Sequence, residues 1–144
     1  MTRVFLDSSV FFSAAYSPRG HARDLIMMAL RGGIDMVLSR IVIEENRRNR
    51  AASAPEQLPF LGFVLESVSY EVARPTKEEV LSASKYTALK DAPIAAAAKA
   101  GKAEPLATLD RKHLLGSPEL KELAGSDIVS PEEAVEKLRA REGE

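Results

Sequence analysis

The sequence predicts an α/β fold with a mostly parallel central sheet. Short apolar segments alternate with longer segments of helical periodicity along the 144 residues. The first apolar segment, Val4-Phe5-Leu6, shows no polar alternation, which is typical of a central strand covered by helices on both faces. No repeat, low-complexity tract or linker divides the chain, so we expect one domain over residues 1–144.

The first half of the chain contains three of the expected strands. Apolar residues occupy 4–6, 34–38 and 68–73, although Glu71 weakens the alternation in the third strand. Between these strands, the spacing of apolar residues predicts helices at 10–15, 21–31, 39–52 and 55–67. Ser39 is placed to cap the third of these helices, and Pro59 and Gly62 are expected to bend the fourth.

The second half begins two of its helices with capping boxes, Thr76 with Glu79 and Ser130 with Glu133. Asp91 is placed to cap an alanine-rich helix whose first turn accommodates a proline. The expected helices cover 76–88, 91–101, 117–125 and an amphipathic segment after 130. Two further apolar segments predict strands at 105–109 and 127–129.

Composition restricts the possible chemistry. There are no cysteines, and His21 and His113 are the two histidines, so a thiolate or histidine-built zinc site is excluded. A metal ion here would be a hard cation held by carboxylate oxygens. The net charge of −1 excludes a uniformly basic nucleic-acid surface, and no segment approaches the roughly 20 apolar residues of a membrane span. We therefore expect a soluble cytoplasmic protein without a membrane partner.

Four acidic residues fall near the ends of strands or the beginnings of helices: Asp7, Glu45, Asp91 and Asp110. In a parallel sheet these positions share one edge, so the four carboxylates are expected to face a common cleft. Three alternatives remain open at this point. Asp7 and Asp91 could act only as helix caps, Glu44 could replace Glu45, and four of the 21 acidic residues could fall at such positions by chance.

A carboxylate cluster of this kind needs cations to offset its own repulsion. Mg²⁺ or Mn²⁺ suits an oxygen-only site, and such ions activate water and stabilise the leaving oxygen in phosphodiester hydrolysis. Ser9 and Thr108 add hydroxyl groups beside the expected site. Arg47, Arg48, Arg111 and Lys112 are candidate contacts to a nucleic-acid backbone, although a solvated protein surface explains them equally well.

In four segments the chain resembles the PIN-domain nucleases, particularly the toxin-type ribonucleases of bacterial and archaeal toxin–antitoxin pairs. The segments are 4–10 (VFLDSSV), 39–45 (SRIVIEE), 91–98 (DAPIAAAA) and 106–110 (LATLD), and they occur in family order. The chain departs from the pattern in two places: Asn46 and Arg47 stand where the family more often has apolar residues after the glutamate, and Pro93 is unusual so early in its helix.

The resemblance implies a three-layer α/β/α fold with a parallel sheet in the order 3-2-1-4-5. It also implies that Asp7, Glu45, Asp91 and Asp110 bind Mg²⁺ or Mn²⁺ and form the catalytic site of an endoribonuclease. Glu45 is preferred to Glu44 because the family's acid usually lies six residues after the serine that matches Ser39. A protein antitoxin and a homodimer formed through apolar helices are implied as partners.

Two other classes of function remain open from the sequence. The chain could be a catalytically weak PIN-like module that binds RNA or protein. It could also be a phosphatase with Asp7 as nucleophile, although Ser9 stands where such enzymes generally have a second aspartate. The particular RNA, the existence of an antitoxin, and the number of metal ions are not determined by the sequence.

Overall fold

The computed structural model describes residues 1–85, 91–112 and 114–142. Its centre is β1 (Arg3–Leu6), which pairs in parallel with β2 (Asp35–Ser39) on one side and β4 (Pro105–Ala107) on the other. The remaining strands, β3 (Tyr70–Ala73) and β5 (Asp127–Val129), lie at the edges. The five-stranded sheet therefore has the order β3-β2-β1-β4-β5 and is parallel throughout, which confirms the predicted α/β fold.

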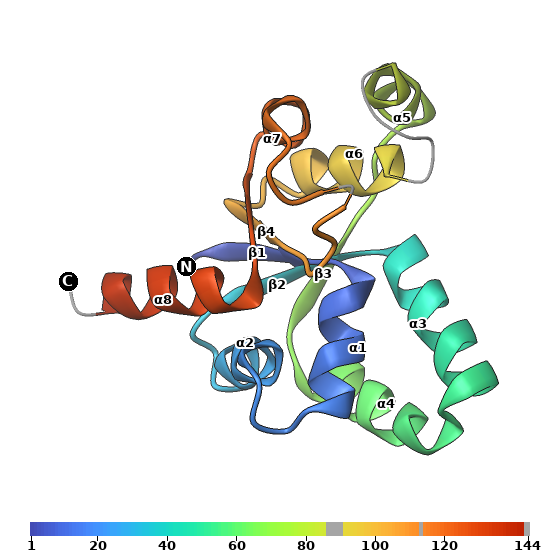
Figure 1. Ribbon diagram of the computed structural model, residues 1–144, viewed down its shortest axis with the longest axis vertical. Helices are drawn as coiled ribbons and strands as arrows, with labels where there is room; N and C mark the ends of the chain where they lie inside the picture. Colours follow the sequence, from blue (N-terminus) through green and yellow to red (C-terminus); the bar gives the residue numbers. More distant parts are fainter. Residues whose placement is uncertain (86–90, 113, 143–144) are drawn as a thin grey trace.

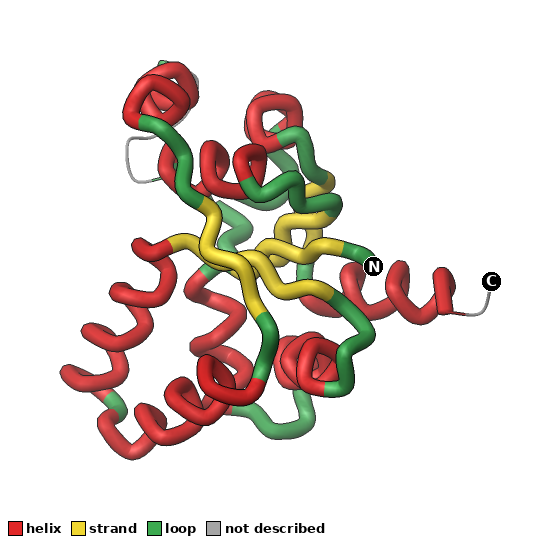
Figure 2. The backbone as a smooth tube through the Cα atoms, turned by 180° about the vertical axis from the view of Figure 1, so that it is seen from behind, coloured by secondary structure: helices red, strands yellow, loops and turns green. Residues whose placement is uncertain are grey.

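Helices cover both faces of this sheet (Figures 1 and 2). One layer contains α1 (Ser8–Tyr16), α2 (His21–Leu30), α3 (Arg40–Ser53), α4 (Leu58–Ser67) and α8 (Pro131–Glu142), with a short 3-10 helix, η1 (Pro55–Gln57), before α4. The other layer contains α5 (Lys77–Ser84), α6 (Ala92–Ala100) and α7 (Pro118–Ala124). Among the described residues, no helix is both long and apolar enough to cross a membrane.

The core forms on both faces of β1. Val4, Phe5 and Leu6 have no exposed surface, as the absence of polar alternation in this segment predicts. Five alanines of α6 are buried, and their small side chains allow this helix to pack closely over β2 and β3. The apolar faces of α1 and α2 fill the opposite side of the sheet.

Several predicted boundaries differ from the structure. The fourth strand ends at Ala107 rather than Leu109, and the third begins at Tyr70 rather than Val68. The helix predicted over 55–67 is divided before Leu58, not bent at Pro59. Pro59 lies in the first turn of α4, where its missing N–H removes no helical hydrogen bond. The end of the helix predicted over 76–88, and His113, lie outside the described residues.

The capping predictions based on hydroxyl groups are confirmed. Ser39 Oγ accepts from the Val42 N–H at 3.2 Å, and Ser130 Oγ accepts from the Glu133 N–H at 3.2 Å. At α5, Thr76 Oγ1 accepts from the Glu79 N–H, and the Glu79 carboxylate accepts from the Thr76 N–H. The bond from the Thr76 backbone is the main cause that lowers the pKa of the Glu79 carboxyl below its ordinary value.

Gly101 sets how closely α6 approaches the sheet. A Cβ atom at this position would lie 2.6 Å from Val37 Cγ1, 3.2 Å from Ala73 Cβ and 3.3 Å from the Ala97 carbonyl oxygen. The Gly101 carbonyl also accepts a 2.8 Å hydrogen bond from Arg3 Nε, which joins the end of α6 to β1. The C-terminal end of α6 is therefore held at a fixed height above β2 and β3.

We expect Gly101→Ala to lower the free energy of unfolding by about 1–3 kcal/mol, because buried Val37 has one stiff rotamer and cannot yield without strain. Chemical denaturation followed by circular dichroism measures this change. Gly62→Ala is the matched control. It lies inside α4 with no atom within 4 Å of the added Cβ, so it should raise stability by about 0.5–1 kcal/mol. Equal effects of the two substitutions would contradict this account.

Candidate active site

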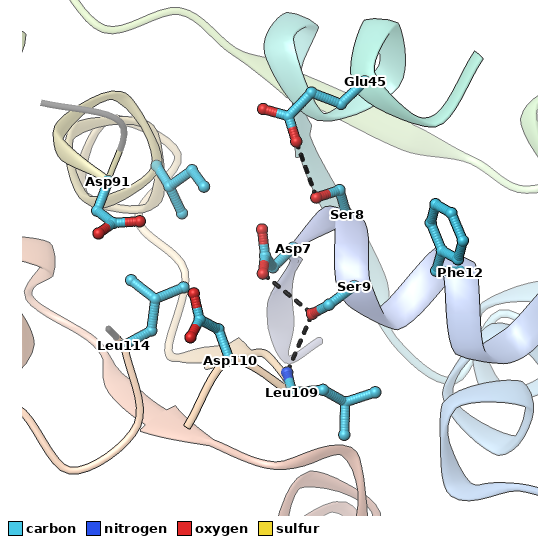
Figure 3. A pocket seen from close by; sticks show the side chains of 10 residues that line it. Asp7, Ser8, Ser9, Phe12, Glu45, Asp91, Leu109, Asp110 and Leu114 are labelled. Atoms are coloured by element: carbon cyan, nitrogen blue, oxygen red, sulfur yellow. Dashed lines mark hydrogen bonds between the residues drawn. The ribbon is translucent and has the colours of Figure 1, made fainter. Parts of the chain in front are cut away.

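A pocket of about 500 Å³ lies at the carboxyl edge of the sheet, where β1, β2 and β4 end. All four predicted acids line it, two directly after strands β1 and β4 and two on or before helices α3 and α6 (Figure 3). The lining residues are Asp7, Ser8, Ser9, Phe12, Glu45, Asp91, Ile94, Leu109, Asp110 and Leu114. Four of these described residues are acidic and none is basic, so the pocket carries a concentrated negative charge.

Asp7 is held by two hydroxyl groups on the same oxygen. Thr108 Oγ1 donates to Asp7 Oδ2 at 2.8 Å, and Ser9 Oγ donates to it at 3.0 Å. Asp7 is only 4% exposed, and Thr108 is fully buried. Because both bonds converge on Oδ2, the carboxylate plane is fixed, and the second oxygen faces away from Ser9 (Figure 3). Ser9 and Thr108 thus lie beside Asp7, and both hydroxyl groups bind its carboxylate.

The turn that follows β4 anchors both hydroxyl groups. Thr108 Oγ1 accepts from the Asp110 N–H at 3.1 Å, and Ser9 Oγ accepts from the Leu109 N–H at 3.0 Å. Each hydroxyl therefore accepts from the backbone and donates to the same carboxylate oxygen. Hydrogen bonds arranged in series polarise one another, and together they hold the Asp7 side chain in one position.

The sequence predicts that Asp110 ends the fourth strand. In the structure β4 ends at Ala107, and Asp110 lies three residues further along the chain. Its Oδ1 accepts from the Lys112 N–H at 3.1 Å, which fixes the side chain within the turn. Pairing nevertheless continues past β4, because the Thr108 N–H donates to the Val129 carbonyl at 2.9 Å. The sheet thus supports the turn that carries Asp110 to the pocket.

Glu45 reaches the pocket because of where α3 begins. The Ser39 cap fixes the first turn, and Glu45 is the sixth residue of the helix. Its Oε2 accepts from Ser8 Oγ at 3.0 Å, which joins α3 to α1 (Figure 3). Glu44 lies on the exposed side of α3, where Arg40 Nε pairs with it at 3.0 Å. Of the two alternatives, the structure places Glu45 at the pocket.

Asn46, which departs from the family pattern, occupies a buried position on α3. Its Nδ2 donates to the Val42 carbonyl at 3.0 Å, so part of its polar group is satisfied within the same helix. A polar residue at this apolar position therefore does not change the phase of α3. Glu45 remains on the side of the helix that faces the pocket.

Asp7 and Asp91 occupy the N-cap positions of α1 and α6, but neither side chain makes a capping hydrogen bond. The prediction that Asp91 caps its helix through its side chain is therefore wrong. Its backbone is already helical, with φ −94° and ψ −20°, whereas a capping residue is usually extended. Both aspartates are nevertheless 4% exposed. Helix capping does not account for two buried carboxylates in one pocket.

The donors of the pocket are carboxylate and hydroxyl oxygens, which fit Mg²⁺ or Mn²⁺ and exclude a soft metal. The acidic side chains, however, do not lie close together. Among the described residues, no group of three or more histidine, cysteine, aspartate or glutamate side chains lies close enough to hold an ion. The four acids share a pocket wall without forming a closed ligand shell.

The candidate RNA-binding residues lie outside this pocket. Arg47 and Arg48 are exposed on α3, beyond Glu45, and Arg111 and Lys112 are exposed directly after Asp110. They thus lie on the two elements that carry two of the acids. Their exposure is compatible with both interpretations given above, phosphate contact and ordinary solvation.

The sequence reasoning did not identify the apolar part of the pocket. Phe12, Ile94, Leu109 and Leu114 line it together with the acids. Phe11 and Phe12 are adjacent on a short helix, and the sequence gives no indication of which ring enters the core. The interaction of Ser8 with Glu45 was also missed. Only the position of α3 beside α1, a tertiary contact, reveals it.

The fold and the pocket define an α/β protein with an acidic site at the carboxyl edge of a parallel sheet. The crystal structure of PAE2754 from Pyrobaculum aerophilum is similar to this chain, with a TM-score of 0.66 at 20% sequence identity. The alignment covers 96% of this chain and 90% of that chain, so the two share a fold over nearly their whole lengths. Neither a protein-family model nor a curated protein matches the sequence significantly.

Thr108→Val should lower the free energy of unfolding by about 1.5–3 kcal/mol, because it removes a buried hydrogen bond to the Asp7 carboxylate. It also leaves the Asp110 N–H without the acceptor it now has. Urea denaturation in the absence of divalent ions measures the loss. Thr2→Val is the matched control, because the Thr2 hydroxyl accepts an exposed bond from Arg141, and its loss should change stability by less than about 0.5 kcal/mol.

Proposed function

We propose that the chain is a Mg²⁺- or Mn²⁺-dependent endoribonuclease of the PIN-domain type. The observation that carries this proposal is the pocket itself. It gathers Asp7, Glu45, Asp91 and Asp110 at the carboxyl edge of the sheet, without a basic residue among its described lining. Two of these carboxylates are buried at helix N-caps that they do not cap. Carboxylates that are buried in one pocket, without serving as helix caps, favour a site that binds cations.

Each residue has a distinct part in this proposal. Asp7 is oriented by Ser9 and Thr108, and its remaining oxygen is the donor offered to a cation. Glu45 is oriented by Ser8, and Asp110 by the turn that contains it. When bound, the ion supplies Lewis-acid stabilisation of the phosphate oxygens and a water of lowered pKa. The protein supplies the fixed negative oxygens that would hold the ion.

RNA is the proposed substrate class, as the resemblance to toxin-type PIN domains implies. Arg47, Arg48, Arg111 and Lys112 are exposed on the elements that border the pocket, where they are available to phosphate groups. We propose that these four residues contact the phosphate backbone of the RNA. A protein antitoxin and a second copy of the chain, docked through apolar helices, complete the proposal as partners.

One observation favours a second candidate function, a PIN-like binding module with weak catalysis. The described acidic side chains do not converge into a closed ligand shell. A site of this openness is compatible with weak metal affinity, and the pocket and its basic surroundings then serve recognition of RNA or protein. Metal binding separates the two candidates, as does the effect of removing single carboxylates.

Asp7→Asn and Asp91→Asn should each lower kcat/KM for Mg²⁺-dependent RNA cleavage by at least about 100-fold, because a metal contributes several kcal/mol to such reactions. Thermal melting should show both variants folded. Asp35→Asn, at the opposite end of β2, is the matched control and should retain cleavage. Cleavage by both pocket variants at the wild-type rate would overturn the site assignment.

Mn²⁺ should stabilise the wild-type protein by about 2.7 kcal/mol at a hundredfold excess over its Kd, since it binds the folded state. Differential scanning fluorimetry across a Mn²⁺ titration measures the shift in Tm. The shift should disappear in Asp7→Asn and persist in Asp35→Asn. If the wild-type Tm does not respond to Mn²⁺, the binding-module candidate replaces the nuclease.

A further inference from the structure

The apolar lining of the acidic pocket differs between its two sides. Ile94 and Leu114 are 6% and 1% exposed, so they belong to the core and offer no surface to a ligand. Leu109 is 42% exposed, and Phe12 is half-buried. In Figure 3, Phe12 and Leu109 lie on the side of the pocket away from Asp91. This side presents accessible apolar surface directly beside the carboxylates.

Helix geometry fixes the place of Phe12. Ser8 and Phe12 are four residues apart on α1 and therefore share one face of the helix. The Ser8–Glu45 hydrogen bond turns this face toward α3. Both helices begin at the carboxyl edge of the sheet and run away from it in the same general direction (Figure 1). Phe12 therefore lies one turn beyond the carboxylates, and Arg48 lies at the corresponding position after Glu45 on α3.

Leu109 is placed by the same bonds that fix Asp7. Its backbone N–H donates to Ser9 Oγ, which donates to Asp7 Oδ2. The backbone that carries the exposed leucine side chain is thus tied to the segment that contains Asp7 and Phe12. An aromatic ring and an aliphatic side chain that line the same pocket as the carboxylates offer apolar surface to a flat group.

We propose that Phe12 and Leu109 form a subsite for one unpaired nucleobase of an RNA strand, next to the phosphodiester that enters the acidic pocket. The inference rests on the proposed ribonuclease function and adds a determinant of substrate choice to it. The base stacks on Phe12, Leu109 contacts its edge, and the next phosphate along the strand lies near Arg48. Aromatic side chains bind splayed bases in single-stranded RNA in this way.

The subsite also predicts which parts of an RNA strand are cleaved. A base within a duplex is stacked on both faces and has no free face for Phe12. Cleavage is therefore expected in loops and single strands, and a paired nucleotide at the subsite excludes the strand from the pocket. Stacking depends little on base identity, so the subsite selects unpaired RNA rather than a sequence.

The test is a cycle that removes the ring and the base separately. Wild-type protein and Phe12→Leu are each given a single-stranded RNA and the same RNA with one abasic nucleotide beside the cleavage site. Phe12→Leu keeps an apolar side chain for packing but has no aromatic face. Loss of stacking should lower kcat/KM by about 5- to 150-fold for either change alone. When Phe12→Leu is given the abasic RNA, the fall in kcat/KM should equal that of one change alone, not the product of the two falls.

Two further variants complete the design. Phe12→Trp retains a stacking face and should retain most of the activity, with a penalty for the abasic RNA like that of the wild type. Phe63→Ala removes an exposed phenylalanine of α4 and should change neither rate. If Phe12→Leu shows the wild-type abasic penalty, the subsite is disproved, and the apolar pair is then a surface for another class of partner.

Failure of the subsite is distinguishable from failure of the nuclease proposal. If the wild-type protein binds labelled RNA but does not cleave it, the nuclease proposal fails, and the same cycle measured in Kd decides the subsite. If the wild-type protein neither binds nor cleaves single-stranded RNA, both are overturned. Suppose that Asp7→Asn abolishes cleavage, but the losses in kcat/KM caused by Phe12→Leu and by the abasic nucleotide multiply. The nuclease proposal is then supported and the subsite is disproved.

Discussion

The strand β1 is buried on both faces and paired in parallel on both edges, and the remaining architecture follows from this burial. Residues in such a strand have no solvent side, so polar groups can appear only where the strand ends. Asp7 occupies that point. Because every neighbouring strand runs in the same direction, the chain leaves β1, β2 and β4 at one edge, and three of the pocket's acids lie within a few residues of those exits.

Hydroxyl groups hold two of the pocket's carboxylates, those of Asp7 and Glu45. Ser8, Ser9 and Thr108 each donate to a carboxylate, and two of them accept from the backbone of the turn after β4. The ion pairs Arg40–Glu44 and Lys121–Asp127 are exposed and lie outside the pocket lining. Hydroxyl groups fix the Asp7 and Glu45 carboxylates without neutralising their charge.

Much of the fold could be predicted from local patterns, and much of the pocket could not. Hydroxyl caps at Ser39, Thr76 and Ser130 follow from residue type and spacing, because the interactions span three residues. The strand order came from family resemblance, since residue patterns do not encode which strands pair. Asp91 shows the limit of capping rules, because its type and position suit a cap while its backbone is already helical. The place of Phe12 in the pocket could not be predicted, because the sequence does not show which of two adjacent phenylalanines faces the core. Only the position of α3 beside α1 decides this.

The close packing at Gly101 has a consequence for the opposite end of α6. This helix has nine residues and is therefore about 13 Å long. Its C-terminal end rests on Val37 and Ala73 and is joined to Arg3, while Asp91 precedes its first residue. A helix of this length moves as a rigid rod, so a tilt about its fixed end becomes a displacement of the carboxylate at the other. The position of Asp91 in the pocket therefore depends on contacts made at the other end of α6.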